Sequence, residues 1–210
     1  MVRILLVDDH AVVREGIKRI FDGRPGEALF GEASSIQEAL KLIQERVWDV
    51  VVLDISLGGE NGLEILKEMK KIHPQLPVLI LSMHSEEQYA RRAFKAGASG
   101  YITKSSSRTE IVHAINKVIM GRKYVSPVFA EKLVADIARG IDGAPHAILS
   151  DREFEVMRLI GSGKTVSEIA EILSLSDRTI STYRARILGK MKMKTNAELI
   201  RYVIENKLIN

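Results

Sequence analysis

Four stretches of this 210-residue sequence run through apolar residues and then end on a polar side chain. Uninterrupted apolar runs are typical of strands buried on both faces of a parallel sheet, and open parallel sheets bind ligands at the carboxyl ends of their strands. We therefore expect three carboxylates, one hydroxyl and one amine to meet at one edge of a single sheet. These side chains are Asp8 and Asp9 after residues 4–7, Asp54 after 50–53, Ser82 after 78–81 and Lys104 after 101–103.

A fifth apolar run, residues 28–31, completes the pattern of an α/β domain because segments of helical periodicity separate all five runs. Five alternating strand and helix units predict a doubly wound, five-stranded parallel sheet over residues 1–122. The helices are expected at residues 12–21, 36–43, 63–69, 86–96 and 109–120.

Residues 123–146 are predicted to form a linker that contains one helix. Ser126 followed by Pro127 is a typical helix start, and apolar residues continue at helical spacing to Gly140. The stretch 140–146 contains Gly and Pro and no periodicity, so we expect the hinge there.

Residues 147–210 carry the start signals of four short helices. At three starts a hydroxyl stands three residues before a Glu, which predicts reciprocal capping, and the fourth has the hydroxyl alone. Only residues 174–176 separate the second and third helices, which predicts a helix-turn-helix in a small all-α, four-helix domain. The pairs are Ser150 with Glu153, Thr165 with Glu168 and Thr195 with Glu198, with Ser176 alone, and the helices are 151–160, 166–173, 177–191 and 196–206.

Composition excludes several classes of protein. The chain has no cysteine, which excludes disulfides and thiolate metal sites, and no apolar run approaches the roughly 18 residues of a membrane span. We therefore expect a cytoplasmic protein with no membrane partner. The five histidines are scattered without ligand spacing and are interpreted as structural or surface groups.

The expected cluster of Asp8, Asp9 and Asp54 suits a hard divalent cation, because converging carboxylates repel one another. Mg²⁺ favours carboxylate and water oxygens and typically brings phosphate oxygens with it. A carboxylate beside such an ion can attack a phosphoryl donor, so Asp54 is predicted to become an acyl phosphate. Lys104 would offer a positive charge to the phosphoryl oxygens, and the Ser82 hydroxyl would donate a hydrogen bond.

These residues resemble the receiver domain of two-component response regulators, which has a flavodoxin-like fold. The resemblance implies that a sensor histidine kinase phosphorylates Asp54. It implies that Mg²⁺ is held by Asp8, Asp9, Asp54 and the backbone carbonyl of Ser56. It also implies that Tyr101 is an aromatic switch that swings inward when Ser82 moves toward the phosphoryl group. The matching pieces are Asp8, Asp9, Asp54, Ser82, residues 96–101 and Lys104.

The loop 56–62 departs from that family at Gly58, where its members usually have proline. Adjacent Gly58 and Gly59 make this loop more flexible. We therefore expect metal affinity or phosphoryl lifetime to differ from the family norm, while the acceptor chemistry is retained.

The predicted helix 177–191 has an apolar stripe on one side and hydroxyl, small and basic side chains on the other. Such a helix suits the major groove of DNA, with bases read near its N-terminus and phosphates contacted along its sides. Arg184 lies beside the apolar stripe, and this position is equally consistent with an intradomain ion pair and with a phosphate contact. The predicted DNA-contacting residues are Arg178, Ser181, Thr182, Ala185, Arg186, Lys190 and Lys192.

Residues 149–209 resemble the LuxR-type helix-turn-helix through residues 149–153, 169–170 and 179–183, and the two halves together resemble a NarL/FixJ-type regulator. The resemblance implies base contacts at Ser181, Thr182 and Ala185. Ser181 and Tyr183 stand where many members have lysine and histidine, so base preference cannot be taken from those members.

The predicted function is a transcription factor in which phosphorylation of Asp54 alters dimerisation or frees the DNA-binding domain. Its expected partners are a sensor histidine kinase, double-stranded DNA, and a second copy when phosphorylated or DNA-bound. We do not expect this protein to be an enzyme.

The sequence allows three other interpretations to be compared with this one. A phosphohydrolase or phosphotransferase is disfavoured by Ser56, because enzymes of the haloacid-dehalogenase type use an aspartate two residues after the nucleophile. Another alternative is a DNA-binding protein whose receiver is not phosphorylated and serves to dock another protein. A nucleotide-binding loop at residues 161–165 is rejected, because Arg158 occupies the required glycine position and a helix precedes it.

Overall fold

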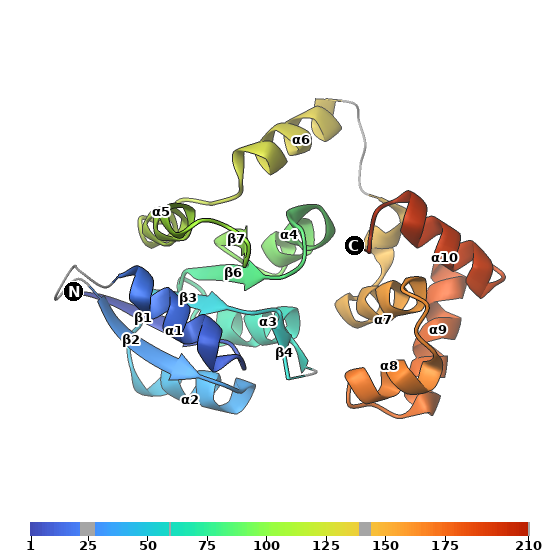
Figure 1. The fold of residues 1–210 in the computed structure, drawn as a ribbon, viewed down its shortest axis with the longest axis horizontal. Helices are drawn as coiled ribbons and strands as arrows, with labels where there is room; N and C mark the ends of the chain where they lie inside the picture. The colour runs from blue at the N-terminus through green and yellow to red at the C-terminus, as the bar shows by residue number, and fades with distance from the viewer. Residues whose placement is uncertain (22–27, 59, 139–143, 210) are drawn as a thin grey trace. The chain divides into compact units, whose positions relative to one another are not determined.

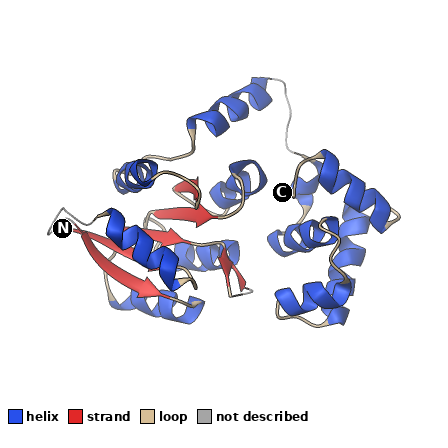
Figure 2. Ribbon diagram, viewed as in Figure 1, coloured by secondary structure: helices blue, strands red, loops and turns tan. Residues whose placement is uncertain are grey.

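The structure is a computed structural model that describes residues 1–21, 28–58, 60–138 and 144–209. The chain divides into two compact units, Met1–Leu133 and Val134–Asn210. The first contains strands and helices, and the described part of the second is helical (Figures 1 and 2). Residues 140–143 of the predicted hinge at 140–146 lie outside the described residues.

The first unit contains a parallel sheet with the strand order β2-β1-β3-β6-β7. Every residue of β3 and β6 is buried, which explains why their aliphatic runs are uninterrupted. The first strand lies between the second and third, so the prediction of a doubly wound sheet is confirmed. The strands are β1 (Val2–Val7), β2 (Ala28–Ala33), β3 (Val50–Leu53), β6 (Val78–Ser82) and β7 (Gly100–Thr103).

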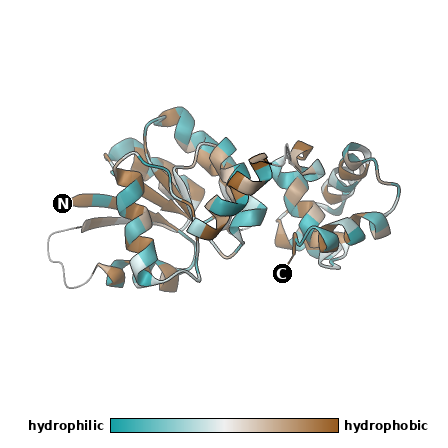
Figure 3. Ribbon diagram, turned by 90° about the horizontal axis from the view of Figure 1, so that it is seen from above, coloured by the Kyte–Doolittle hydropathy of each residue, from teal (hydrophilic) through white to brown (hydrophobic). Residues whose placement is uncertain are grey.

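Helices cover the sheet, and apolar and polar residues, brown and teal in Figure 3, alternate along them. Ile17 of α1 and Ile115 of α5 belong to a core cluster with alternate strand residues such as Ile4 and Val52. The other strand positions point to the opposite face. The helices are α1 (Ala11–Ile20), α2 (Ile36–Glu45), α3 (Gly62–Ile72), α4 (Glu86–Lys95) and α5 (Arg108–Ile119).

A short antiparallel pair, β4 (Ser56–Leu57) and β5 (Glu60–Asn61), follows β3 and was not predicted. Two-residue strands are too short to produce a periodic signal in the sequence. The pair shapes the loop that contains Gly58.

Helix α6 (Pro127–Ala138) begins where the sequence predicts, because the Ser126 hydroxyl accepts a hydrogen bond from Phe129 N. The segment before it is attached to the sheet edge. Tyr101 N donates to Tyr124 O at 3.0 Å, and Tyr124 N donates to Ser99 O at 3.1 Å. The start of α6 is therefore tied to β7 by backbone hydrogen bonds.

The second unit has the four predicted helices, preceded by a short 3₁₀ turn, η1 (Pro145–Ile148), that was not predicted. Reciprocal capping is confirmed at Ser150 and Thr165 but is incomplete at Thr195. The Thr195 hydroxyl caps the helix, but the Glu198 carboxylate accepts from Lys194 N instead of Thr195 N. The helices are α7 (Asp151–Gly161), α8 (Val166–Ile172), α9 (Asp177–Met191) and α10 (Asn196–Glu205).

None of the helices in the described ranges combines the length and apolar character that crossing a membrane requires.

Candidate functional site

An acidic pocket lies at the carboxyl ends of β1, β3 and β7. Asp8 and Asp54 are buried there, and Lys104 reaches both of them. Lys104 Nζ donates a hydrogen bond to Asp54 Oδ2 at 2.6 Å. Lys104 Nζ also lies 2.6 Å from Asp8 Oδ2. These two groups form an ion pair, but their geometry is not that of a hydrogen bond. The structure thus brings together three side chains that are up to 96 positions apart in the sequence, as the strand-end pattern predicts.

Asp9 lies at the exposed rim of this pocket, and both of its carboxylate oxygens have neighbours. Asp9 Oδ2 accepts a hydrogen bond from Gly58 N at 3.2 Å, and Asp9 Oδ1 lies 2.8 Å from His10 Nδ1. Gly58 has φ +55°, which proline cannot adopt, and proline has no N–H to donate. The chain's departure from the usual proline is therefore what makes this contact to Asp9 possible.

Two residues at the pocket were missed by sequence reasoning. His10 was interpreted as a scattered surface group, but its ring lies beside Asp9 and 3.2 Å from Asp8 Oδ1. Its position next to Asp9 in the sequence was the available signal. Arg14 donates to Asp8 O at 2.6 Å and is held in turn by Glu32 of β2. No sequence pattern indicates that pairing, because it depends on how α1 packs on the sheet.

The pocket contains more negative than positive charge. Burial raises the pKa of the Asp54 carboxyl above its ordinary value and Asp8 adds to the rise, although hydrogen bonds from Lys104 and Ser56 N oppose it. Burial disfavours the charged form of Lys104, but the two carboxylates outweigh this effect and raise its pKa. Burial is thus the main cause of the raised pKa at Asp54, whereas the two carboxylates are the cause of the raised pKa at Lys104.

The donor atoms of this pocket fit a divalent cation. One ligand atom from each of Asp8, Asp9, His10 and Asp54 lies within 4.8 Å of the others. The three carboxylates supply the hard oxygen ligands that Mg²⁺ prefers. Ser56, also predicted at the metal, donates its N–H to Asp54 Oδ1 at 3.0 Å and so orients the Asp54 carboxylate.

The two predicted switch residues are connected through His84. Ser82 is fully buried at the end of β6, and its hydroxyl accepts from His84 N at 3.1 Å. Tyr101 is also fully buried, and its hydroxyl donates to His84 O at 2.9 Å. The loop after β6 therefore contacts both side chains at once.

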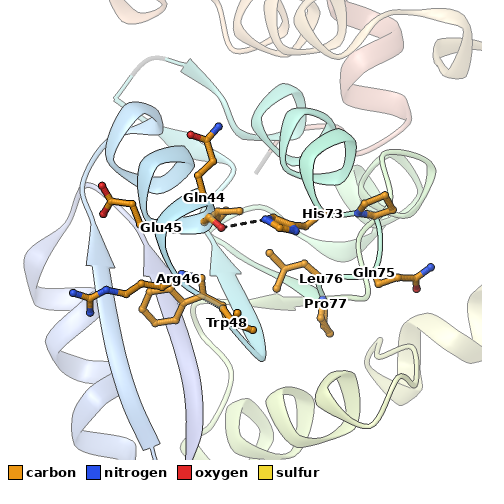
Figure 4. A pocket seen from close by; sticks show the side chains of 11 residues that line it. Gln44, Glu45, Arg46, Trp48, His73, Gln75, Leu76 and Pro77 are labelled. Atoms are coloured by element: carbon orange, nitrogen blue, oxygen red, sulfur yellow. Dashed lines mark hydrogen bonds between the residues drawn. The ribbon is translucent and has the colours of Figure 1, made fainter.

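A separate pocket of about 540 Å³ lies beside Trp48 and His73, whose Nε2 is 3.2 Å from Ile43 O (Figure 4). Its lining residues 46–48 and 74–77 precede β3 and β6, so it lies at the amino ends of the strands. It is thus at the opposite sheet edge from the acidic pocket and contains none of the predicted site residues.

In the second unit, helix α9 buries Ile180 and Ile187 and leaves the opposite side exposed. Two cations of this helix have partners within the unit. Arg184 donates to Asn196 Oδ1 at 2.6 Å, and Lys190 Nζ lies 2.7 Å from the buried Glu153 carboxylate. Arg184 thus has an intradomain partner, but that partner is a neutral amide and not the acid of the predicted ion pair. The exposed predicted residues are Arg178, Ser181, Thr182, Ala185, Arg186, Lys190 and Lys192.

We expect Glu153→Gln to lower the free energy of unfolding of the second unit by about 1–2 kcal/mol at pH 7, because Lys190 loses a charge-assisted hydrogen bond. Burial opposes ionisation of Glu153, but Lys190 and Ser150 hold its pKa below the ordinary 4.5. The stabilisation is therefore present above pH 4.5 and lost as the pH falls through the lowered pKa.

Urea unfolding followed by helical circular dichroism measures this effect. Trp48, the only tryptophan, lies in the first unit, so its fluorescence transition is an internal control that should not move. An unchanged dichroism transition at pH 7 would contradict the prediction.

The family model "Response regulator receiver domain" matches residues 4–116, and "Bacterial regulatory proteins, luxR family" matches residues 147–203. The chain is 35% identical to the response regulator UvrY of Escherichia coli K12 over 211 residues, covering 100% of this chain and 97% of that protein. It is 34% identical to GacA of Pseudomonas syringae pv. syringae, covering 100% and 99%.

Solved structures show the same architecture. A LuxR-family two-component response regulator from Aurantimonas matches with 41% identity and a TM-score of 0.60, covering 65% of this chain and 97% of that chain. RcsB of Salmonella typhimurium matches with a TM-score of 0.70 over 98% of both chains, and at 22% identity this likeness shows the fold alone.

A receiver fold with an acidic pocket, joined to a helix-turn-helix unit, defines a DNA-binding transcriptional regulator of a two-component system. The chain belongs to the NarL/FixJ-type response regulators.

Proposed function

We propose that Asp54 is the phosphoacceptor of a switch that controls DNA binding by this regulator. The observation that carries the proposal is the buried Asp54 carboxylate, which is oriented by Ser56 N and contacted by the Lys104 ammonium. A phosphoryl group added there brings roughly −1.5 to −2 charges. Lys104 and the Ser82 hydroxyl are the groups that would bind its oxygens.

Asp8, Asp9, Asp54 and the Ser56 carbonyl would hold Mg²⁺, with His10 beside them. The ion supplies charge neutralisation between the incoming phosphoryl group and the carboxylates. The Asp54 oxygen attacks phosphorus, the P–N bond of a phosphohistidine on the sensor kinase breaks, and the departing imidazole takes a proton from solvent. No second aspartate follows Asp54 by two residues, which supports a single stoichiometric transfer over hydrolytic turnover.

The receiver offers a route from this pocket toward the second unit. Ser82 is bonded to His84 N, and Tyr101 to His84 O, while Tyr101 N is bonded to Tyr124 O just before α6. Glu86, which begins α4, accepts hydrogen bonds from the backbone and hydroxyl of Ser126. A movement of Ser82 toward a phosphoryl group would thus disturb the contacts that hold the start of α6.

For the second unit we propose that the exposed face of α9 contacts double-stranded DNA and that two copies bind together. Support comes from the LuxR-family match and from a Salmonella RcsB structure described as bound to promoter DNA in the presence of a phosphomimetic. Two copies predict an inverted repeat with half-sites about one helical turn apart, or a multiple of it.

The function is tested by incubating the protein with a small phosphodonor and Mg²⁺. Intact mass spectrometry should show one phosphoryl group per chain, and the affinity for duplexes selected from a random library should rise. Multiple turnover on phosphomonoesters would favour the enzyme interpretation. Equal DNA affinity with and without the phosphoryl group would favour an unphosphorylated docking receiver.

We expect Asp9→Asn to lower the affinity for a divalent cation by at least about tenfold, because one anionic ligand is lost from the pocket. Mn²⁺ titration followed by electron paramagnetic resonance measures the binding directly. Asp49→Asn changes a carboxylate that accepts from Arg3 N away from the pocket, and it serves as the charge-matched control. Unchanged Mn²⁺ affinity in Asp9→Asn would remove Asp9 from the proposed metal ligands.

A further inference from the structure

The exposed face of α9 has a donor and acceptor pattern that restricts which bases it can read. Thr182 is exposed, and its hydroxyl donates a hydrogen bond to Arg178 O at 2.9 Å, one helical turn back. Its only hydroxyl proton is therefore used within the helix. Thr182 therefore retains its oxygen lone pairs and its γ-methyl group for contacts with a partner.

Ala185 lies next to Thr182 on the same exposed face and offers only a methyl group. Gly189 follows one turn later, and a Cβ placed on it would have no heavy atom within 4 Å. The centre of the face is thus small and apolar, which permits close approach to a groove floor. Positions 182, 185 and 189 are not lysines, which would donate hydrogen bonds to guanine.

Arg178 and Arg186 are exposed on either side of Thr182, four residues before it and four after it. Their guanidinium groups are suited to phosphate oxygens or to the O6 and N7 acceptors of guanine. The guanidinium donors of this face therefore lie one turn before and one turn after Thr182, and the exposed Ser181 hydroxyl lies beside it.

In the major groove, thymine is the base that presents a methyl group, and threonine and alanine methyls are its usual apolar contacts. Resting on the proposed DNA contact by α9, we propose that each half-site contains a thymine whose 5-methyl group packs between Thr182 and Ala185. Thr182 is a specificity-determining residue for that thymine, and it acts through its methyl group.

The test uses the phosphorylated full-length protein and an operator selected from a random duplex library. Each thymine of a half-site is replaced in turn by deoxyuridine, which removes only the methyl group. We expect one position per half-site at which affinity falls about fourfold, the effect of burying one methyl group. Thr182→Ser, which removes the γ-methyl and keeps the hydroxyl, should bind thymine and deoxyuridine operators nearly equally. Thr182→Val, which keeps the methyl and removes the hydroxyl, should retain the discrimination.

Discrimination that is retained in Thr182→Ser and lost in Thr182→Val overturns the proposal, because the hydroxyl would then be the reading group. An operator in which no deoxyuridine position matters also overturns it, while leaving DNA binding intact. Failure of the phosphorylated protein to select any sequence contradicts the DNA-contacting face itself. Circular dichroism of both variants verifies folding, which is expected because Thr182 is exposed.

Discussion

Asp54→Asn is expected to abolish phosphorylation by a small phosphodonor in the presence of Mg²⁺. The amide keeps the shape of the side chain, but it is a far weaker nucleophile and contributes no negative charge to a cation. Intact mass spectrometry should show the unmodified mass only. The affinity for the selected operator should no longer respond to the phosphodonor.

Asp49→Asn is the matched control for this variant. Asp49 accepts from Arg3 N at the start of the sheet, so the change in charge is the same but the pocket is untouched. This variant should be phosphorylated like the parent protein. A phosphoryl group on Asp54→Asn at another residue would show that the acceptor has been wrongly assigned.

Gly62→Ala is expected to lower the free energy of unfolding of the first unit by about 3 kcal/mol. A Cβ on Gly62 would lie 2.4 Å from Ile55 Cα and 2.7 Å from Asp54 O, which are backbone atoms that cannot rotate away. Because relief requires moving the acceptor loop, phosphorylation should slow as well. Urea unfolding followed by Trp48 fluorescence measures the stability.

Gly16→Ala provides a control of opposite sign. Gly16 lies within α1, and a Cβ there would meet nothing within 4 Å. Alanine should therefore stabilise the first unit by roughly 0.5–1 kcal/mol through helix propensity alone. If both variants unfold at the same urea concentration, close backbone packing at Gly62 is not the cause.

The parallel sheet and the helix starts could be predicted from the sequence because their signals are local. The buried run before Asp54 and the hydroxyl of Ser150 each act within a few residues of the element they specify. Strand-end residues such as Asp8 and Lys104 could be placed together because parallel strands share one carboxyl edge. The capping box at Thr195 was only half correct, since Lys194 N competes for the same carboxylate.

Contacts between distant side chains could not be predicted in this way. Lys190 was predicted as a DNA contact, and nothing local indicates that its ammonium meets Glu153, 37 residues earlier. The Gly58 contact to Asp9 spans 49 residues and depends on a positive φ that composition does not reveal. Such contacts depend on packing angles and rotamers, which have no periodic signature.

The class of fold and the strand edge at which the acidic residues collect follow from the amino-acid sequence alone, and so does the prediction of which helix contacts DNA. These follow from hydrophobic periodicity and capping, which act over a few residues. The three-dimensional packing was needed to place His10, Arg14 and Gly58 N–H around the acidic pair and to show that the Thr182 hydroxyl is turned onto its own helix. Those facts arise from how separate elements pack and from which acceptor each donor finds nearest.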